Sequence, residues 1–304
     1  MKAVVYRRYG GPEVLEYTEV PEPKLSQNSV LVRVRAAALN PADHKLQSGL
    51  GDGHTDAWFP VIPGWDLAGV VEQVGAGVSE FAPGDEVIGY IAQPILHHGA
   101  YAELVSAPVE ALARKPRTAT WPEAAGLPLA GLTAYRAIVQ TLEVAPGETV
   151  LIHGAAGGVG ALAAQLALAR GARVIGVAST GHHAFLRSIG VLPVGQGDDL
   201  AALVWALAPD GIDAVLDCVG NGALGAAAEV GSARLRACSI ADGGPGIATV
   251  FARQDSAILA RLAEMVDAGG LRVPIAAIYP LAHAALAQTA LKGSHPPGKI
   301  VLVI

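Results

Sequence analysis

The chain reads ETVLIHGAAGGVG at residues 148–160, and this stretch decides its fold. An apolar strand runs into a glycine-rich turn, and a helix with almost no charge is predicted for Ala161–Arg170. A second strand, Arg173–Ala178, would complete a βαβ unit. Small residues at such a turn let backbone N–H groups approach a pyrophosphate closely, and the helix N-terminus adds a favourable dipole. We therefore predict a dinucleotide-binding site.

The glycine pattern departs from the usual G-x-G-x-x-G spacing, because Ala155 holds the first glycine position. A tight strand-to-helix turn in some other layered fold is the alternative interpretation. If the dinucleotide interpretation holds, the cofactor contacts at this turn are Ala156, Gly157, Gly158 and Val159.

The end of the second strand indicates which dinucleotide binds. An NAD site usually carries Asp or Glu there, about twenty residues past the turn, to accept hydrogen bonds from the ribose. Here the strand runs into Ser-Thr-Gly-His-His at 179–183, without a carboxylate. Ser179 and Thr180 can donate to a 2′-phosphate, so we predict NADPH. His182, His183 or Arg187 could supply positive charge. Alternatively, Ser179 caps the next helix and the histidines lie in solvent.

Composition excludes several classes of protein. With 304 residues, 52% of them hydrophobic and 16% charged, the chain can bury a large core and form two domains. A net charge of −6 without any basic run argues against a nucleic-acid surface. No apolar run reaches the roughly 18 residues of a membrane span. Without signal-peptide features or a disulfide framework, and with only Cys218 and Cys238, a cytoplasmic protein is expected.

The pattern of predicted secondary structure changes near residue 120. Short alternating strands such as Val30–Arg35 and Gly69–Val74, separated by glycine–proline turns, predict an antiparallel, barrel-like β domain. From Trp121 onward helices alternate with apolar strands, and the candidate parallel strands are 150–153, 174–178, 214–218 and 235–240. A final helix at 281–291 and a strand at 299–304 are expected to return to the first domain.

Several collinear motifs resemble the zinc-independent medium-chain dehydrogenases/reductases. They are NPAD at 40–43, PGWDLAGVV at 63–71, FAPGDEV at 81–87, GAYAE at 99–103, EAAGLP at 123–128, LTAY at 132–135 and GKIVL at 298–302. Within this family the chain is most similar to NADPH:quinone oxidoreductases, the zeta-crystallin and enoyl-reductase branch. The resemblance implies an α/β protein with a GroES-like β-rich catalytic domain, residues 1–120 plus 270–304. It also implies a Rossmann domain with a doubly wound parallel sheet, residues 121–269, and a homodimer.

The same resemblance bears on metal binding. Alcohol dehydrogenases of this superfamily place a cysteine ligand shortly after the segment that matches 36–40, and a Gly-His-Glu later. Here Asn40 is followed by Pro-Ala-Asp and Gly64 by Trp-Asp, and no cysteine precedes Cys218. We therefore predict no zinc site.

Without a Lewis acid, the expected chemistry is hydride delivery from NADPH to a quinone or to the β-carbon of an enone. By resemblance, Asn40 lies beside the nicotinamide and Thr133 near its carboxamide. Asp43, His44 and Lys45 follow Asn40 closely and could line the same cleft, with Lys45 as a candidate oxyanion partner. The alternatives are a turn residue before Pro41 for Asn40 and a helix-interior hydroxyl for Thr133. For Asp43, His44 and Lys45 the alternative is the solvated face of a short helix. Val219 and Ile240 complete the predicted cofactor contacts.

Two other functions stay open. One is an enoyl reductase of a biosynthetic pathway, acting on acyl thioesters, and the other is a non-catalytic NADPH-binding redox sensor. Many relatives carry a lysine where His183 stands, so NADP binding through this histidine would depend on pH. Neither a proton donor nor the physiological acceptor can be identified from the sequence.

Overall fold

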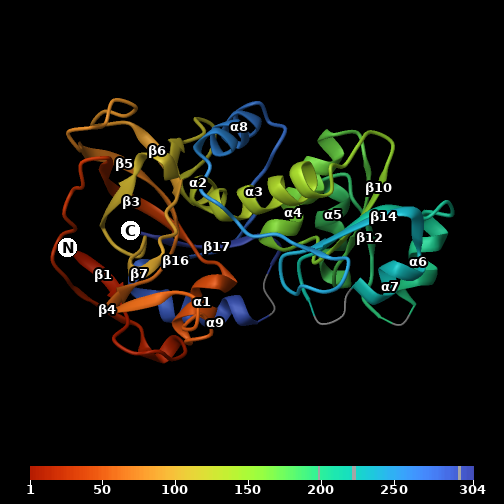
Figure 1. The fold of residues 1–304 in the computed structure, drawn as a ribbon, viewed down its shortest axis with the longest axis horizontal. Coiled ribbons are helices and arrows are strands. Elements are labelled where there is room, and N and C mark those ends of the chain that lie inside the picture. Colours follow the sequence, from red (N-terminus) through yellow and green to blue (C-terminus); the bar gives the residue numbers. More distant parts are fainter. Residues whose placement is uncertain (198, 221–223, 294–295) are drawn as a thin grey trace. The chain divides into compact units, whose positions relative to one another are not determined.

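The computed structural model describes residues 1–197, 199–220, 224–293 and 296–304 (Figure 1). Its contacts divide the chain into two compact units. Unit 1 comprises Met1–Leu129, Gln254–Ala268 and Val273–Ile304, and unit 2 comprises Ala130–Arg253 and Gly269–Arg272.

This division differs from the domain ranges expected from the sequence in three segments, one of which is residues 270–272, expected in the β-rich domain but placed in unit 2. Residues 121–129 and 254–268 were expected in the nucleotide domain, but they contact unit 1. Helix α8 (Ser256–Asp267) contacts strand β9 (Leu112–Arg114), and its Asp267 carboxylate accepts a hydrogen bond from the Thr118 N–H at 2.9 Å. Helix α2 (Trp121–Gly126) contacts strands of the unit 1 sheet.

The main sheet of unit 1 has the strand order β16-β17-β3-β5-β6-β9, and β8 also pairs with β3. Neighbours are antiparallel except for β16 and β17. The strands of this sheet not yet delimited are β3 (Ser29–Ala38), β5 (Asp66–Val74), β6 (Glu86–Tyr90), β8 (Leu104–Pro108), β16 (Ile275–Pro280) and β17 (Lys299–Val303). Because β17 pairs with β3, the chain's tail joins the β-rich unit.

Smaller elements surround this sheet. Strand β1 (Lys2–Val5) pairs with β2 (Glu16–Glu19), and β4 (Asp56–Ile62) pairs with β7 (Ile95–His98). The helical segments of unit 1, besides α2 and α8, are η1 (Pro12–Val14), α1 (Pro41–Gln47), η2 (Val109–Ala111), η5 (Leu281–His283) and α9 (Ala284–Lys292).

Alternation along β3 explains how this sheet forms. Val30, Val32 and Val34 are buried, whereas Arg33 and Arg35 on the opposite face are exposed. The buried face joins a core with Leu67, Val87, Ile300 and Leu302. A buried valine or leucine contributes roughly 1.5–3 kcal/mol relative to an exposed one, so this face stabilises the unit 1 fold.

Unit 2 is a parallel sheet with the strand order β12-β11-β10-β13-β14-β15 in the described residues. The strands are β10 (Thr149–His153), β11 (Arg173–Val177), β12 (Leu192–Val194), β13 (Ile212–Asp217), β14 (Gly231–Ser239) and β15 (Ala248–Thr249). The chain starts at the centre, adds strands outward on one side and then crosses to the other. This is the doubly wound Rossmann topology, so the predicted fold class is confirmed.

Helices alternate with these strands along the chain. They are α3 (Pro128–Tyr135), η3 (Arg136–Thr141), α4 (Gly158–Ala169), η4 (Thr180–His182), α5 (His183–Ser188), α6 (Leu200–Leu207) and α7 (Leu224–Glu229). Helix α4 begins at Gly158, so the predicted start at Ala161 was wrong. Gly160 lies in the first turn of α4. Only glycine fits there, because a Cβ would lie 2.2 Å from the Gly154 carbonyl oxygen. The glycine lets the helix start close against the strand end.

The alanine that breaks the glycine pattern has a partner on the neighbouring strand. Ala155 is fully buried, and a Cβ built on Gly176 in β11 would lie 2.8 Å from the Ala155 Cβ. The same Cβ would lie 2.7 Å from Val191 Cγ1. Glycine at 176 therefore leaves the space that alanine at 155 occupies.

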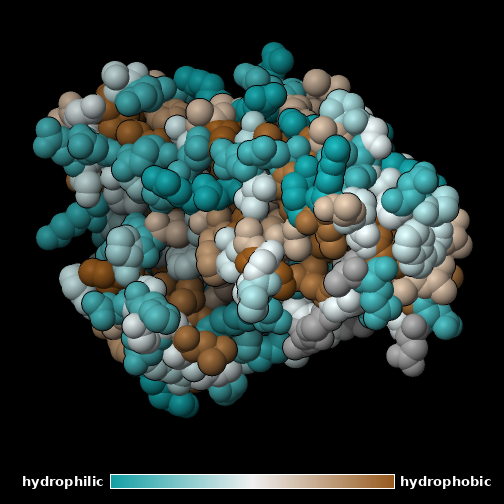
Figure 2. All heavy atoms as spheres, turned by 45° about the vertical axis from the view of Figure 1, so that its right-hand side comes forward, coloured by the Kyte–Doolittle hydropathy of each residue, from teal (hydrophilic) through white to brown (hydrophobic). Residues whose placement is uncertain are grey.

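The face of the molecule in Figure 2 is covered largely by hydrophilic side chains, with hydrophobic ones in smaller patches between them. Exposed ion pairs on unit 1 include Lys2–Glu19 at 2.9 Å and Arg7–Glu16 at 3.3 Å. Such pairs contribute roughly 0–1 kcal/mol each, so they do not decide the fold. Among the described residues, no helix has both the length and the apolar character needed to cross a lipid bilayer.

We expect Gly176→Ala to lower the free energy of unfolding by about 1–3 kcal/mol, because its methyl group would overlap Ala155 and Val191. Thermal unfolding followed by circular dichroism measures the loss. Gly195→Ala is the matched control, since a Cβ there meets nothing within 4 Å. In an Ala155→Gly background the cost of Gly176→Ala should shrink, and an unchanged cost would contradict this explanation.

Candidate active site

Most of the predicted cofactor contacts lie at one edge of the unit 2 sheet. Because β10, β11, β13 and β14 are parallel, their carboxyl ends share this edge. The residues that follow these strand ends include Ala156, Gly157, Gly158, Val159, Ser179, Thr180, Val219 and Ile240. The strand order reverses at β10, and ligands of doubly wound sheets bind at such a switch point.

The glycine turn has the geometry that a pyrophosphate needs. Gly154 has a positive φ of 71°, and a Cβ there would lie 2.8 Å from Val219 Cγ2. Gly157 is the N-cap of α4, and the first N–H groups of a helix have no partner within the helix. These N–H groups and the positive end of the helix dipole favour an anion. The residues at this turn therefore fit the phosphates of a dinucleotide.

A buried hydrogen-bond network, which was not predicted from the sequence, holds the neighbouring loops. The Asp217 carboxylate accepts hydrogen bonds from the Val219 N–H at 2.8 Å, the Gly220 N–H at 3.0 Å and the Ser239 hydroxyl at 2.8 Å. The Ser239 Oγ in turn accepts from the Ala241 N–H at 3.1 Å. This network fixes the loops that carry Val219 and Ile240. The polar residues Asp217 and Ser239, at the ends of β13 and β14, are the signal that could have revealed it.

The segment after β11 presents hydroxyl groups to solvent. Ser179 occupies the N-cap position of η4 but makes no side-chain capping bond, and its Oγ lies 3.2 Å from His182 Nδ1. Both Ser179 and Thr180 are exposed. His183 is half-buried, with Nε2 lying 3.3 Å from the Ala178 carbonyl oxygen. The hydroxyls are therefore accessible to a ligand, whereas the His183 ring faces the backbone.

The two contacts predicted for the nicotinamide end lie in different units. Thr133 is buried within α3, in unit 2. Asn40 is buried in unit 1, where it is the N-cap of α1 and precedes Pro41 at the first helical position. Asn40 is thus the helix-starting residue that the alternative interpretation described, and its side chain also takes part in a buried cluster.

This cluster joins Asn40, Asp66 and Lys299. The Asn40 Nδ2 donates to Asp66 Oδ2 at 2.9 Å, and the Lys299 ammonium donates to Asn40 Oδ1. Lys299 Nζ also donates to the Leu39 carbonyl at 2.8 Å and lies 3.6 Å from Asp66 Oδ2. The second Asp66 oxygen accepts from the Leu129 N–H at 2.7 Å. Each charged group of the cluster is therefore hydrogen-bonded in a buried setting.

Asp43 extends this cluster from helix α1. Its Oδ2 accepts hydrogen bonds from the Asn40 N–H at 2.8 Å and from the Tyr101 hydroxyl at 3.1 Å. The Tyr101 ring packs against Gly64, where a Cβ would lie 2.3 Å from two ring atoms. Gly64 has a positive φ of 90°, so glycine is required there for both reasons.

Burial dominates the electrostatics of the cluster. It raises the pKa of Asp43 to about 7, with a further contribution from the negative charge of Asp66. The Asn40 N–H, Lys299 and the Tyr101 hydroxyl oppose this rise. Burial likewise raises the pKa of Asp66 and lowers that of Lys299, and the attraction between these two opposes both shifts.

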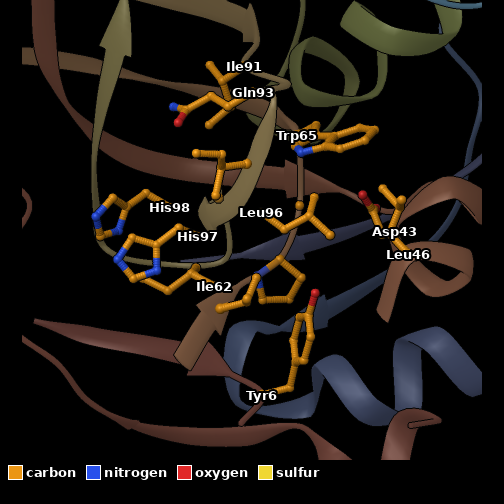
Figure 3. A pocket seen from close by; sticks show the side chains of 15 residues that line it. Tyr6, Asp43, Leu46, Ile62, Trp65, Ile91, Gln93, Leu96, His97 and His98 are labelled. Carbon is orange, nitrogen blue, oxygen red and sulfur yellow. The ribbon is translucent and has the colours of Figure 1, made fainter. Parts of the chain in front are cut away.

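A pocket opens beside Asp43, with about 340 Å³ of empty volume that is partly open to solvent (Figure 3). Its walls are mostly apolar, and Asp43, Tyr6, Gln93 and the adjacent His97 and His98 add polar groups. All of its lining residues belong to unit 1: Tyr6, Asp43, Leu46, Val61, Ile62, Pro63, Gly64, Trp65, Ile91, Gln93, Ile95, Leu96, His97, His98 and Gly99.

Lys45, the predicted oxyanion partner, is not one of the lining residues. Its side chain is exposed on α1, as the alternative interpretation described. Asp43 lines the pocket instead. Its position is readable from the sequence, because an acidic residue three positions after a helix-starting Asn turns back toward the N-cap.

The described residues hold no group of three or more His, Cys, Asp or Glu side chains that could bind a metal ion. Both cysteines of the sequence, Cys218 and Cys238, belong to unit 2. The donor groups of unit 1 therefore do not fit a cysteine-containing zinc site.

Comparison with known proteins gives consistent matches along the chain. Residues 26–117 match the alcohol dehydrogenase GroES-like domain, and residues 196–302 match the family described as zinc-binding dehydrogenase. The chain is 33% identical over 314 residues to the chloroplastic NADPH-dependent alkenal/one oxidoreductase of Arabidopsis thaliana, covering 99% of this chain and 79% of that protein. It spans only 53–59% of the length of the next curated relatives that it matches.

Among the solved structures that resemble the whole chain are the following two. One is described as an NAD-dependent alcohol dehydrogenase, with a TM-score of 0.92, 30% identity and full coverage of both chains. The other is the quinone oxidoreductase from Coxiella burnetii, with a TM-score of 0.87 and 30% identity, covering 100% of this chain and 99% of that one.

We expect Lys299→Met to lower the free energy of unfolding at pH 7 by about 3–5 kcal/mol, because the Asp66 carboxylate would be left buried without its cation. Without Lys299 the folded-state pKa of Asp66 rises further above its unfolded value. The loss should therefore be largest above that pKa and shrink as the pH falls and Asp66 takes up a proton.

Urea unfolding of both proteins between pH 5 and pH 8 measures this difference, and Lys24→Met on the exposed surface is the control. A stability difference that does not change with pH would contradict the electrostatic explanation.

Proposed function

This chain belongs to the medium-chain dehydrogenase/reductase family, in its quinone-oxidoreductase-like branch, and we propose that it is an NADPH-dependent reductase of quinones and α,β-unsaturated carbonyl compounds. The observation that carries the proposal is the match over 99% of the chain to a relative named as an NADPH-dependent alkenal/one oxidoreductase. Such a reaction needs a site for the cofactor and a site for the acceptor. The carboxyl ends of the unit 2 strands are the proposed cofactor site, and the pocket of unit 1 is the proposed acceptor site.

The bound nicotinamide cofactor supplies a hydride, and the chain's own residues bind and orient it. In this proposal the turn residues Ala156, Gly157, Gly158 and Val159 hold the pyrophosphate at the N-terminus of α4. Val219 and Ile240, fixed by the Asp217 network, line the same edge. Asn40 and Thr133 are proposed to contact the nicotinamide end.

The preference for NADPH is proposed from the end of β11. Ser179 and Thr180 offer exposed hydroxyl donors where an NAD site usually carries a carboxylate. His183 is the proposed source of positive charge, in place of the lysine of many relatives. The fold by itself supports a nicotinamide cofactor of either kind.

The unit 1 pocket is the proposed acceptor site. Its mostly apolar walls would pack against the carbonyl compound, and its few polar groups would orient the substrate. We propose a reaction without zinc, which is supported by the donor set of unit 1. Lys45 stays outside this proposal, because its side chain is exposed and does not line the pocket.

Two further expectations accompany the proposal. A homodimer formed by sheet extension is supported by the position of β15 at the end of the strand order in the described residues. A cytoplasmic location is supported by the composition and by the two isolated cysteines.

The activity is tested by following NADPH oxidation at ~340 nm, the nicotinamide absorption, with quinones, 2-enals, 2-enones and simple alcohols plus NADP⁺ as substrates. We expect turnover with quinones or enones and none with simple alcohols, since no Lewis acid would stabilise an alkoxide. Alcohol oxidation without conjugated-carbonyl reduction would contradict the proposal and favour an alcohol dehydrogenase.

The cofactor preference is tested with Ser179→Asp. A carboxylate at this strand end repels a 2′-phosphate and accepts hydrogen bonds from an unmodified ribose, so the NADPH-to-NADH ratio of kcat/KM should fall by about tenfold or more. Ser188→Asp, at the exposed end of α5, is the control that adds the same charge. An equal fall in both variants would mean that general charge repulsion, not a phosphate contact at Ser179, sets the preference.

A further inference from the structure

The buried cluster of unit 1 contains two carboxyl groups but a single ammonium group. Lys299 lies 3.6 Å from Asp66, and Asp66 also accepts hydrogen bonds from Asn40 and from the Leu129 N–H. These contacts stabilise the negative charge on Asp66. Asp43 accepts hydrogen bonds from the Asn40 N–H and the Tyr101 hydroxyl, and none of its hydrogen-bond partners in the described part of the chain is a cation. A buried carboxylate without a cation is costly, so the cluster favours a proton on Asp43.

Asp43 also has access to a ligand, which the rest of the cluster lacks. Asp43 lines the pocket, whereas Asp66 and Lys299 do not. Figure 3 shows its carboxyl group among the lining side chains, beside Leu46 and on the same side as Trp65. The group that favours a proton is therefore the one that a molecule in the pocket can reach.

Other titratable groups surround Asp43. Burial raises the pKa values of Tyr6, Tyr90 and Tyr101 above their usual range, and the negative charge of Asp43 adds to each rise, so these hydroxyls stay protonated near neutral pH. Burial lowers the pKa of His44 on the same helix and of His98 across the pocket. The pKa of Asp43, at about 7, lies where its protonation changes in the working range of an enzyme.

We propose that Asp43 is the general acid that protonates the reduced substrate in this pocket, an assignment that rests on the proposed reductase function. For an enone, a hydride with its two electrons forms the new bond at the β-carbon, and NADPH becomes NADP⁺. The alkene π electrons move toward the carbonyl and leave an enolate. The Asp43 O–H bond breaks, its proton forms the new bond at the α-carbon, and the carboxylate left behind is reprotonated from water. The Asn40 N–H and the Tyr101 hydroxyl stabilise that carboxylate.

A purely structural role for Asp43 is the alternative, since its carboxylate also accepts the hydrogen bond of the helix-starting Asn40 N–H. The variant Asp43→Asn separates the two roles. The amide keeps an acceptor oxygen for the Asn40 N–H, but it has no acidic proton to give. Tyr101→Phe is the second variant, because it removes only the hydroxyl that stabilises the Asp43 carboxylate.

The test uses NADPH and an α-substituted 2-enone, and records kcat against pH together with the enantiomeric ratio at the α-carbon. In the unchanged enzyme kcat falls as the pH rises through the pKa of Asp43, because only the protonated acid donates, and one enantiomer dominates. In Asp43→Asn we expect kcat to fall about 100-fold, the pH-dependent fall to disappear and the enantiomeric ratio to approach one. In Tyr101→Phe the fall in kcat should move to higher pH, since the carboxylate has lost a donor.

Glu110→Gln, a carboxyl-to-amide change on the exposed η2 segment, should leave all three readouts unchanged. A pH-dependent fall and an enantiomeric ratio that persist in Asp43→Asn would overturn the assignment, even if kcat is lower. An unshifted pH profile in Tyr101→Phe would also overturn it. Absence of enone turnover in the unchanged enzyme would instead contradict the proposed reductase function, so the two failures are distinguishable.

Discussion

The ion pair between Lys299 and Asp66 is the interaction on which unit 1 depends. It joins β17, near the end of the chain, to β5, and Asn40 connects both charged groups to the start of α1. The Leu129 N–H binds the other oxygen of Asp66, which adds the start of α3. Elements far apart in sequence are thus held by one buried cluster. Because removing either Lys299 or Asp66 would leave the other buried without its opposite charge, the ion pair is costly to alter on one side alone.

The burial of this cluster also determines the protonation of Asp43 at the pocket wall. A cluster with two carboxyl groups and one ammonium group carries an excess negative charge when fully ionised, and burial makes that charge unfavourable. The excess is relieved by a proton, and hydrogen bonding directs it to Asp43, at the pocket wall. Stability and proton transfer therefore depend on the same residues. In unit 2 the corresponding constraint is steric, because the glycine turn and Gly176 must leave room for the helix, for Ala155 and for a ligand.

Most of the fold could be predicted from the periodicity of apolar residues and from local sequence motifs. The apolar strands of unit 2 and the return of the tail to the β-rich unit could be predicted because they follow from local pattern and topology. The start of α4, and the fit of alanine at position 155 in place of glycine, could not be predicted from the sequence. Both depend on atoms of neighbouring strands that contact the turn. Which of Asp43, His44 and Lys45 lines a pocket could not be predicted for a similar reason. All three lie on one short helix. The spacing after Asn40 indicates that Asp43 turns toward the helix N-terminus, but the contact with Tyr101, 58 residues away in sequence, is what shows that its side chain faces inward.

The central claim is that a buried carboxyl group of this cluster holds a proton near neutral pH. Infrared spectroscopy in D₂O measures this directly, since a protonated carboxyl group has a carbonyl band that the carboxylate lacks. We predict a band that disappears as the pH rises through about 7 and is absent from Asp43→Asn. A protein whose carboxyl groups are all ionised well below this pH, or a band that persists in Asp43→Asn, would contradict the account.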